Sequence, residues 1–414
     1  MSILKKGIKN SSFLFAGRFI TIAISFLTSI YVMRMLTLEQ YGSVITVKNY
    51  INFFMYFCFS GLSTAVLLEG TGSKEKLIRL YEETNGLKLI IASIVQVFTL
   101  IFLYFTPYSD QVTFLIIIFS FSIPILSLYN HWKEIFTAYE NFLTISLFKI
   151  IPSIIYFIVS ILFVKNIYNV EILILSQLLL NFLILVFCSF IVRKKVPFRF
   201  NFTRIKFNKK LIISGGYFFI ISFAGMIFAK IDVLMISILG TADQTAIYSA
   251  VNRFVREGSE LRTVLYAGFF PVLIKRLKSG SVSKIKLYKY TVLIFLSLLI
   301  LCIFFSFIGS ELIIFLLTEK YAASANIFKV LIFYLVLEFS IQPYILLLTA
   351  SNNHNTLAII FSILAVSNII VNVLLFNLFG PIGIAYSTLF NYSLFSLLVF
   401  LLGVPILIKT KALI

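Results

Sequence analysis

Apolar residues run along this chain in stretches far longer than the core elements of a soluble domain. Windows 111–130, 172–192, 211–229 and 290–310 contain no Asp, Glu, Lys or Arg, and 339–408 is a single such stretch of 70 residues. About 20 apolar residues in a helix cross the hydrocarbon core of a bilayer. The longest stretch therefore exceeds one span, and turn-forming residues divide it at 351–355 and at Gly380-Pro381.

These windows predict an all-α polytopic membrane protein. Open sheets leave edge groups unpaired in hydrocarbon, and the stretches lack the period-two alternation of barrel strands. We expect about 12 transmembrane helices of roughly 20 residues or more. Their approximate ranges are 12–33, 42–68, 87–106, 112–136, 145–164, 172–192, 211–239, 244–273, 290–308, 322–350, 356–379 and 383–407.

Composition agrees with lipid as the main solvent of the chain. Of 414 residues, 60% are apolar and 12% are charged, and the mean hydropathy is +1.03. A soluble domain carries about twice that charged fraction. Cys58, Cys188 and Cys302 lie inside apolar stretches, and His131 and His354 lie far apart. We therefore expect no disulfide, no metal site and no cofactor.

The net charge of +19 is distributed by membrane topology and does not indicate nucleic-acid binding. With an even number of spans and both termini in the cytoplasm, the predicted cytoplasmic loops hold 25 Lys and Arg residues and the opposite loops hold three. This is the positive-inside pattern. Lys5, Lys6 and Lys9 precede the first span, but no A-x-A cleavage pattern follows it, so we expect an uncleaved helix.

A polar segment, 193–210, lies at the midpoint of the chain and divides six predicted spans from six. We therefore expect an N-terminal six-helix lobe over residues 1–200 and a C-terminal six-helix lobe over residues 201–414. A faint internal echo supports this division, since segment 36–41 precedes Lys48 and segment 239–244 precedes Arg253. Because each lobe has an even number of spans, we expect a pseudo-twofold axis along the membrane normal.

Seven basic residues fall inside predicted spans, where a charge costs about 2.5–3.5 kcal/mol at the bilayer centre. They are Arg18, Lys48, Lys230, Arg253, Arg256, Arg262 and Lys329, accompanied by Asp232, Glu257, Glu260 and Glu338. The eighth span is the most informative, because charges at 253, 256, 257 and 260 share one helix face. That stripe is either the wall of a water-filled cavity or a self-neutralised structural feature.

The charges in the other predicted spans also allow more than one interpretation of where their side chains lie. Arg18 and Lys48 either extend to the head groups or face a cavity, whereas Lys230 and Asp232 lie mid-helix, where such extension is hardest. Spans 1, 2, 7 and 8 together carry six of the cations and three of the anions. A basic aqueous cavity suits an anionic solute, and Arg in particular suits phosphate oxygens.

Five segments form a recognisable pattern along the chain: 34–42 (RMLTLEQYG), 232–235 (DVLM), 247–253 (IYSAVNR), 271–275 (PVLIK) and 380–388 (GPIGIAYST). In order and sequence they resemble the polysaccharide repeat-unit (O-antigen) flippases of the multidrug/oligosaccharidyl-lipid/polysaccharide exporter superfamily. The resemblance implies two six-helix lobes that form a V, with spans 1, 2, 7 and 8 lining a central cavity. Ile247 stands where the family usually has Gly, which is a departure at a tight helix contact.

The resemblance implies a function in O-antigen (lipopolysaccharide) or capsular polysaccharide synthesis. The chain would flip undecaprenyl-pyrophosphate-linked oligosaccharide repeat units from the cytoplasmic to the outer leaflet of the bacterial inner membrane. Expected partners are this substrate, membrane lipids, a polysaccharide polymerase and a chain-length regulator, and no nucleic acid. The predicted substrate-binding residues are Arg18, Lys48, Lys230, Arg253 and Arg256, and the candidates for ion coupling or charge pairing are Asp232, Glu257 and Glu260.

Two alternatives remain open. A cation-coupled multidrug exporter shares the fold, although its cavity should favour the opposite charge. A membrane polysaccharide polymerase is an enzyme, but it usually has a long external loop, and the external loops predicted here are short. Because the chain has no P-loop, G-x-S-x-G motif or paired-carboxylate site, we expect a transporter without catalytic residues.

Overall fold

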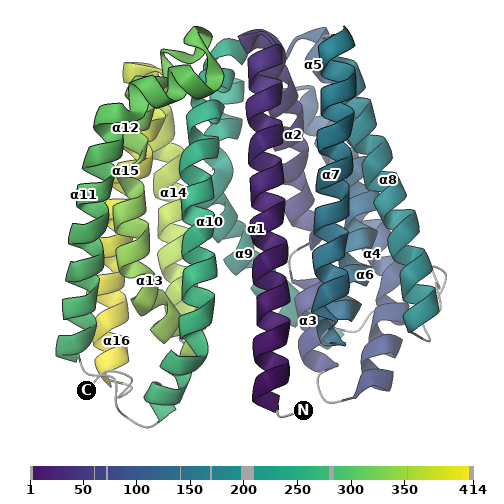
Figure 1. Cartoon of the computed structure of the whole chain (residues 1–414). Helices are drawn as coiled ribbons and strands as arrows, with labels where there is room; N and C mark the ends of the chain where they lie inside the picture. Colours follow the sequence, from purple (N-terminus) through teal and green to yellow (C-terminus); the bar gives the residue numbers. More distant parts are fainter. Residues whose placement is uncertain are drawn as a thin grey trace. The chain divides into compact units, whose positions relative to one another are not determined.

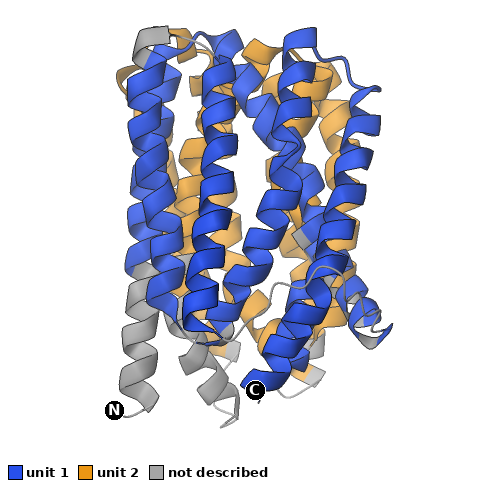
Figure 2. Ribbon diagram, turned by 90° about the vertical axis from the view of Figure 1, so that its right-hand side faces the viewer, with its two compact units in different colours: residues 1–223 blue, residues 224–414 orange. Residues whose placement is uncertain are grey.

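The computed structural model describes residues 3–59, 61–70, 73–139, 141–167, 170–196, 209–278, 284–351 and 353–409. Within these ranges the regular elements are helices and no strand occurs. The chain divides into two compact units, unit 1 (Met1–Phe223) and unit 2 (Ala224–Ile414), which Figure 2 colours separately. The domain boundary that we predicted between residues 200 and 201 lies outside the described residues and stays a prediction.

Unit 1 is built from long helices that can be followed in Figure 1. They are α1 (Ile3–Met35), α2 (Leu38–Phe59), α3 (Leu62–Glu69), α4 (Lys74–Leu103), α5 (Asp110–Phe119), α6 (Ser122–Ala138), α7 (Phe142–Ile167) and α8 (Val170–Lys195). Helix α9 (Lys209–Leu239) begins in unit 1 and ends in unit 2. Within unit 1, α1 packs along α7, and α6 packs against both α4 and α8.

Unit 2 continues with a second set of helices. They are α10 (Ala242–Lys278), α11 (Lys284–Leu317), the 3-10 turn η1 (Glu319–Tyr321), α12 (Ser324–Leu331), α13 (Tyr334–Ala350), α14 (His354–Phe379), α15 (Pro381–Leu398), the π-helical turn η2 (Val399–Gly403) and α16 (Val404–Lys409). Helix α14 packs against α15, and α13 packs against α11 and α10.

The prediction of an all-α polytopic membrane protein is confirmed. Eleven helical segments of the described residues are long and apolar enough to cross a membrane. The twelfth predicted span, 244–273, lies within α10, which has 37 residues but a mean hydropathy lowered by its charged stripe. On α11 the apolar side chains of Ile300, Phe307 and Phe315 are 70–79% exposed. Such a surface is stable only against hydrocarbon, so these helices face lipid.

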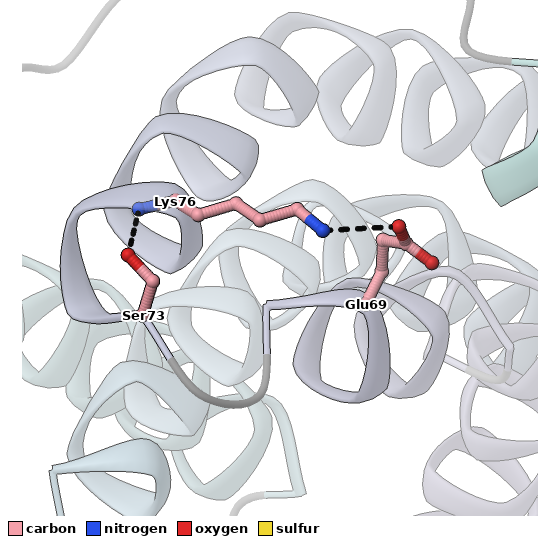
Figure 3. A network of polar contacts seen from close by, with 3 residues as sticks. All are labelled: Glu69, Ser73 and Lys76. Atoms are coloured by element: carbon pink, nitrogen blue, oxygen red, sulfur yellow. Dashed lines mark hydrogen bonds and ion pairs between the residues drawn. The ribbon is translucent and has the colours of Figure 1, made fainter.

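One part of the predicted loop structure is wrong. We placed Lys74, Lys76, Arg79 and Lys88 in a cytoplasmic loop, but all four belong to α4, and the side chain of Lys88 is fully buried. The helix begins where Ser73 caps it, with Ser73 Oγ accepting from the Lys76 amide at 3.3 Å (Figure 3). The first turns of α4 are charged, and charged helical turns look like a loop when spans are found from apolar residues alone.

The predicted span 42–68 is also interrupted, because α2 ends at Phe59 and α3 begins at Leu62. Gly61 has φ +84°, a backbone conformation that side chains with a Cβ rarely adopt. A Cβ at Gly61 would lie 1.8 Å from the carbonyl oxygen of Gly215 in α9. Glycine is therefore required at position 61, where these two segments of unit 1 meet.

Corresponding helices of the two units begin with the same hydrogen bonds. At the start of α2, the Thr37 amide donates to Gln40 Oε1 (3.1 Å) and the Gln40 amide donates to Thr37 Oγ1 (3.2 Å). At the start of α10, Thr241 and Gln244 repeat both bonds at the same two distances. These are reciprocal capping boxes, and they coincide with the internal echo that the sequence showed.

Candidate functional site

A buried carboxylate is the centre of the polar interior of unit 2. Asp232 of α9 is 7% exposed and accepts three hydrogen bonds from three other helices. The donors are Asn372 Nδ2 of α14 at 3.0 Å, Thr388 Oγ1 of α15 at 3.0 Å and Tyr248 OH of α10 at 3.2 Å. A carboxylate at this depth is stable only when it is paired or hydrogen-bonded, so these donors hold Asp232 and tie four helices together.

Two amide side chains of α14 form a hydrogen-bonded pair next to this carboxylate. Asn372 Nδ2 also donates to Asn368 Oδ1 at 2.5 Å, and Asn368 Nδ2 donates to the Phe228 carbonyl oxygen at 2.8 Å. Asn372 Oδ1 is buried and has no hydrogen-bond partner among the described residues. Carboxylate, amide and hydroxyl oxygens together form the ligand set of a hard cation, so the Asp232 cluster (Asp232, Tyr248, Asn368, Asn372 and Thr388) can hold a monovalent cation or a proton.

The charged stripe of α10 contains an ion pair between two of its members. Arg253 NH2 lies 3.0 Å from Glu257 Oε1, at the i, i+4 spacing that the sequence indicated. The Arg253 Nε atom is buried and has no hydrogen-bond partner within the described residues. The pair thus leaves guanidinium donor capacity unused. Arg256 and Glu260 lie half-buried on the same helix.

Arg262 has a structural partner on another helix. Its guanidinium lies 3.3 Å from Glu338 of α13 and donates to Gln342 Oε1 of the same helix. Tyr392 OH of α15 also donates to Glu338 Oε1 at 3.3 Å. The charges at 262 and 338, which seemed separate in the sequence, therefore neutralise each other between α10 and α13.

The two predicted substrate-binding residues of unit 1, Lys48 and Arg18, have different neighbours. Lys48 of α2 is half-buried and donates from Nζ to Tyr156 OH of α7 at 2.6 Å. The same ammonium lies 4.5 Å from the centre of the Tyr156 ring, which adds a cation–π attraction. Arg18 lies half-buried on α1, next to Gly17, whose close approach to Ser146 packs α1 on α7.

The predicted site residues are thus distributed over both units. Arg18 and Lys48 belong to unit 1, whereas Asp232, the exposed Lys230 and the α10 stripe belong to unit 2. Sequence reasoning missed the neutral members of each cluster, above all Tyr156, Asn372 and Thr388. The available signal was the presence of Asn368 and Asn372 one turn apart in a mostly apolar helix.

Sequence reasoning also missed a polar layer in unit 1. His131 of α6 and Lys88 of α4 are both fully buried. Lys88 Nζ donates to the Cys58 carbonyl oxygen, next to the break between α2 and α3. An ammonium at a helix C-terminus satisfies an orphan carbonyl and complements the helix dipole. Lys88 therefore stabilises the end of α2.

Comparison with known protein families and solved structures identifies the family and the fold of the chain. The family model described as "Polysaccharide biosynthesis protein" matches residues 8–277. No curated protein sequence matches the chain.

Several solved structures of membrane transporters are similar to this one, at low sequence identity. A structure of the lipid II flippase MurJ in an inward closed conformation matches with a TM-score of 0.71 and 17% identity, over 96% of this chain and 90% of that one. An inward-facing multidrug resistance MATE family transporter of the MOP superfamily matches with a TM-score of 0.72 and 13% identity, over 94% and 95%.

A third similar structure is a MOP superfamily transporter from Pyrococcus furiosus, whose binding pocket is described as having reverse polarity. It matches with a TM-score of 0.65 and 12% identity, over 97% of this chain and 96% of that one. At these identities the likeness establishes the fold, whereas the family model covers more than half of the chain. The chain is a multi-pass membrane protein with the MOP-superfamily fold and belongs to the polysaccharide biosynthesis protein family.

Proposed function

We propose that this protein flips polyprenyl-pyrophosphate-linked oligosaccharide units from the cytoplasmic to the outer leaflet of the bacterial inner membrane. The family supplies the connection to polysaccharide synthesis, and the fold is that of transporters, one of which is a lipid II flippase. The observation that carries the proposal is the half-buried Arg253, whose guanidinium keeps an unpaired Nε donor beside a single carboxylate.

We assign recognition of the anionic head group to cationic side chains within the membrane spans. Arg18 and Lys48 of unit 1 and Lys230, Arg253 and Arg256 of unit 2 each contact the pyrophosphate or its sugar during transport. Lys48 is suited to this role because its partner, Tyr156, is neutral and leaves the ammonium charge uncompensated. Arg253 is suited because a guanidinium can bind two phosphate oxygens at once.

The Asp232 cluster is the proposed site of ion coupling. Asn372 Oδ1 is an unpartnered acceptor next to the carboxylate. A cation that displaced the Asn372 and Thr388 donors would gain the two oxygens of those side chains as ligands. Binding of Na⁺ or a proton would then loosen contacts that now join α9 to α14 and α15, which gives a driving ion a way to bias the conformation of unit 2.

The proposed flippase activity implies proteins that supply the substrate and proteins that use the translocated unit. The substrate is delivered by cytoplasmic glycosyl transfer, and the translocated unit is used by a polymerase with a chain-length regulator in O-antigen or capsular polysaccharide synthesis. The predicted topology places the loops rich in Lys and Arg in the cytoplasm, and with an even number of spans it places both termini on the same side.

A second candidate is a cation-coupled multidrug exporter, which the similarity to MATE transporters and the buried Asp232 favour. The two candidates differ in the expected sign of the substrate charge. With Arg262 neutralised by Glu338, α1, α2, α9 and α10 still carry five in-span cations (Arg18, Lys48, Lys230, Arg253 and Arg256) against three anions (Asp232, Glu257 and Glu260), which favours the anionic lipid-linked substrate.

The test replaces Arg253 in a bacterial strain that lacks the gene. Arg253→Gln should lower export of surface polysaccharide by about tenfold or more, since a charge-assisted hydrogen bond contributes about 1.5–3 kcal/mol. Lipid-linked sugar should accumulate on the inner leaflet. Arg79→Gln is the matched control, because Arg79 forms the same i, i+4 pair with Glu83 at 3.0 Å but is exposed.

Two further outcomes distinguish a substrate-binding role of Arg253 from a structural one, and a flippase from a drug exporter. Glu257→Gln should retain export if Arg253 binds substrate, and should fail like Arg253→Gln if the pair is only structural. Normal surface polysaccharide together with altered resistance to cationic dyes would contradict the flippase and support the drug exporter.

A further inference from the structure

Unit 1 contains a polar cavity that the proposed head-group site does not use. Its volume is about 260 Å³, and it is lined by Ser63, Thr64 and Leu67 of α3 and by Asn130 and Glu134 of α6. Thr64 is exposed and Ser63 is 8% exposed, so the cavity leads from the surface to the buried layer around His131. Four of the five lining side chains are polar, which is unusual between two helices of a membrane protein.

Hydrogen bonds behind the cavity fix the direction of the Ser63 hydroxyl. Thr84 Oγ1 donates its proton to the Leu80 carbonyl oxygen at 2.7 Å, so it accepts from His131 Nε2 at 3.0 Å. A neutral His131 with its proton on Nε2 then accepts at Nδ1 from Ser63 Oγ, at 3.1 Å. The lone pairs of Ser63 Oγ are therefore left to accept a hydrogen bond in the cavity.

The α6 side of the cavity offers the complementary groups. Asn130 Nδ2 donates one proton to the Leu126 carbonyl oxygen at 2.8 Å, and its second proton is available to a ligand. The Glu134 carboxylate forms no ion pair with any described residue and can accept from two adjacent hydroxyls. Together with Thr64, which both donates and accepts, these groups match a polyhydroxylated ligand.

Size and charge favour a sugar over a metal cation. A volume of 260 Å³ equals on the order of nine water molecules, and a cavity of about 150 Å³ already holds benzene. Two cations adjoin the single carboxylate: Lys133 Nζ donates to Asn130 Oδ1 at 2.7 Å, and the buried Lys88 lies one helical turn from Thr84. A bare cation would be repelled by them, whereas a neutral ring bearing hydroxyls would not.

We infer that this cavity binds one neutral sugar ring of the transported oligosaccharide. The inference rests on the proposed function and adds a sugar subsite within unit 1 to it. Glu134 and Asn130 bind adjacent hydroxyls, and Ser63, positioned by His131, accepts from a third. In the predicted topology the turn between α3 and α4 is cytoplasmic, so the subsite lies on the side from which the substrate is loaded.

The chain's only tryptophan lies in α6 between the two residues that this helix contributes to the cavity. Trp132 lies between Asn130 and Glu134 in α6, is 4% exposed, and donates to Asn85 Oδ1 at 2.9 Å. The experiment titrates the full-length purified protein in lipid nanodiscs with glucose, galactose, mannose and N-acetylglucosamine and records Trp132 fluorescence. We expect a saturable change with at least one of these sugars, and an affinity about tenfold or more weaker in Glu134→Gln.

Two variants make the result specific. Glu69→Gln is the matched control, because Glu69 ends the same helix α3 but pairs with the exposed Lys76 at 3.1 Å (Figure 3), and its sugar affinity should equal that of the wild type. Thr64→Val preserves shape on an exposed position, so it should fold and still weaken binding, even if Glu134→Gln does not fold.

Three results would overturn the inference. They are no response to any of the four sugars, equal weakening by Glu69→Gln and Glu134→Gln, and a saturable response to NaCl in a choline chloride background that only Glu134→Gln abolishes. The third would identify a cation site. Failure of the proposed function looks different: sugars would bind, yet the strain lacking the gene would make normal surface polysaccharide. If instead the gene restores polysaccharide export and no sugar binds, only the subsite is wrong.

Discussion

Units 1 and 2 start corresponding helices with the same capping box but bury opposite chemistry. The fully buried basic side chains of the described part of unit 1 are Lys88 and His131, whereas unit 2 buries the carboxylates of Asp232 and Glu338. The box fixes how the backbone enters α2 and α10 and leaves the interior free to differ. One helical framework thus presents a cavity suited to a sugar in unit 1 and an oxygen cluster suited to a cation in unit 2.

The cations within the membrane spans also differ between the two units in the charge of their partners. Lys48 of α2, eleven residues after Thr37, donates to the neutral Tyr156, and Arg253 of α10, twelve residues after Thr241, pairs with Glu257. Unit 1 therefore keeps a full positive charge where unit 2 keeps a partly compensated one. Variants that act on one unit and not on its counterpart are the direct way to test this asymmetry.

The largest effect is expected from Asp232→Ala in unit 2. The substitution removes the acceptor of three buried donors, each of which costs roughly 1–3 kcal/mol when left unsatisfied, so stability should fall by about 3 kcal/mol or more. Thermal unfolding followed by size-exclusion chromatography in detergent measures this loss. Asp243→Ala, an exposed aspartate in the first turn of α10, is the control and should cost under about 1 kcal/mol.

Asp232→Asn refines this prediction, because it preserves shape and can still accept through its amide oxygen. It should fold yet lose polysaccharide export if ion coupling requires the carboxylate. Equal stability of Asp232→Ala and Asp243→Ala would show that the cluster does not hold the helices of unit 2.

Two positive-φ glycines give a prediction of intermediate size. Gly61 in unit 1 has φ +84° and a would-be Cβ 1.8 Å from the Gly215 carbonyl oxygen, whereas Gly380 in unit 2 has φ +66° and open space around its Cβ position. Gly61→Ala should therefore cost about 3 kcal/mol or more, from backbone strain plus overlap. Gly380→Ala should cost about 1–3 kcal/mol, from strain alone. The reverse order of the two unfolding temperatures would mean that the break between α2 and α3 is not fixed by this contact.

The smallest effects should come from the capping boxes, and here the units should agree. Thr37→Ala and Thr241→Ala each remove one side-chain acceptor from the exposed start of a helix, which costs about 1 kcal/mol. Their unfolding temperatures should fall by similar amounts. Unequal shifts would show that the two helix starts are equivalent in geometry but not in energy.

The helical architecture could be predicted because hydrocarbon imposes one rule along the whole chain. The apolar windows located eleven spans, and charge spacing alone gave the Arg253–Glu257 pair. The internal echo pointed to Thr37 and Thr241, which proved to be capping residues.

Other features could not be predicted because they depend on distant segments. Thr388 is 156 residues from Asp232, and no local pattern connects them. Lys88 looked like a loop cation, since nothing in its neighbourhood indicates that α4 carries it to a buried carbonyl. Partners of a charge in a membrane protein are therefore a property of packing, whereas its presence within a span is a property of sequence.

Translocation itself is the most direct test of the account. The lipid-linked sugar that accumulates in a strain lacking the gene would be extracted and reconstituted with the purified protein in liposomes, and its exposure measured with a lectin that cannot cross the bilayer. We predict that the wild-type protein makes the inner-leaflet pool accessible and that Arg253→Gln slows this about tenfold or more. Equal accessibility with and without the protein would contradict the flippase assignment.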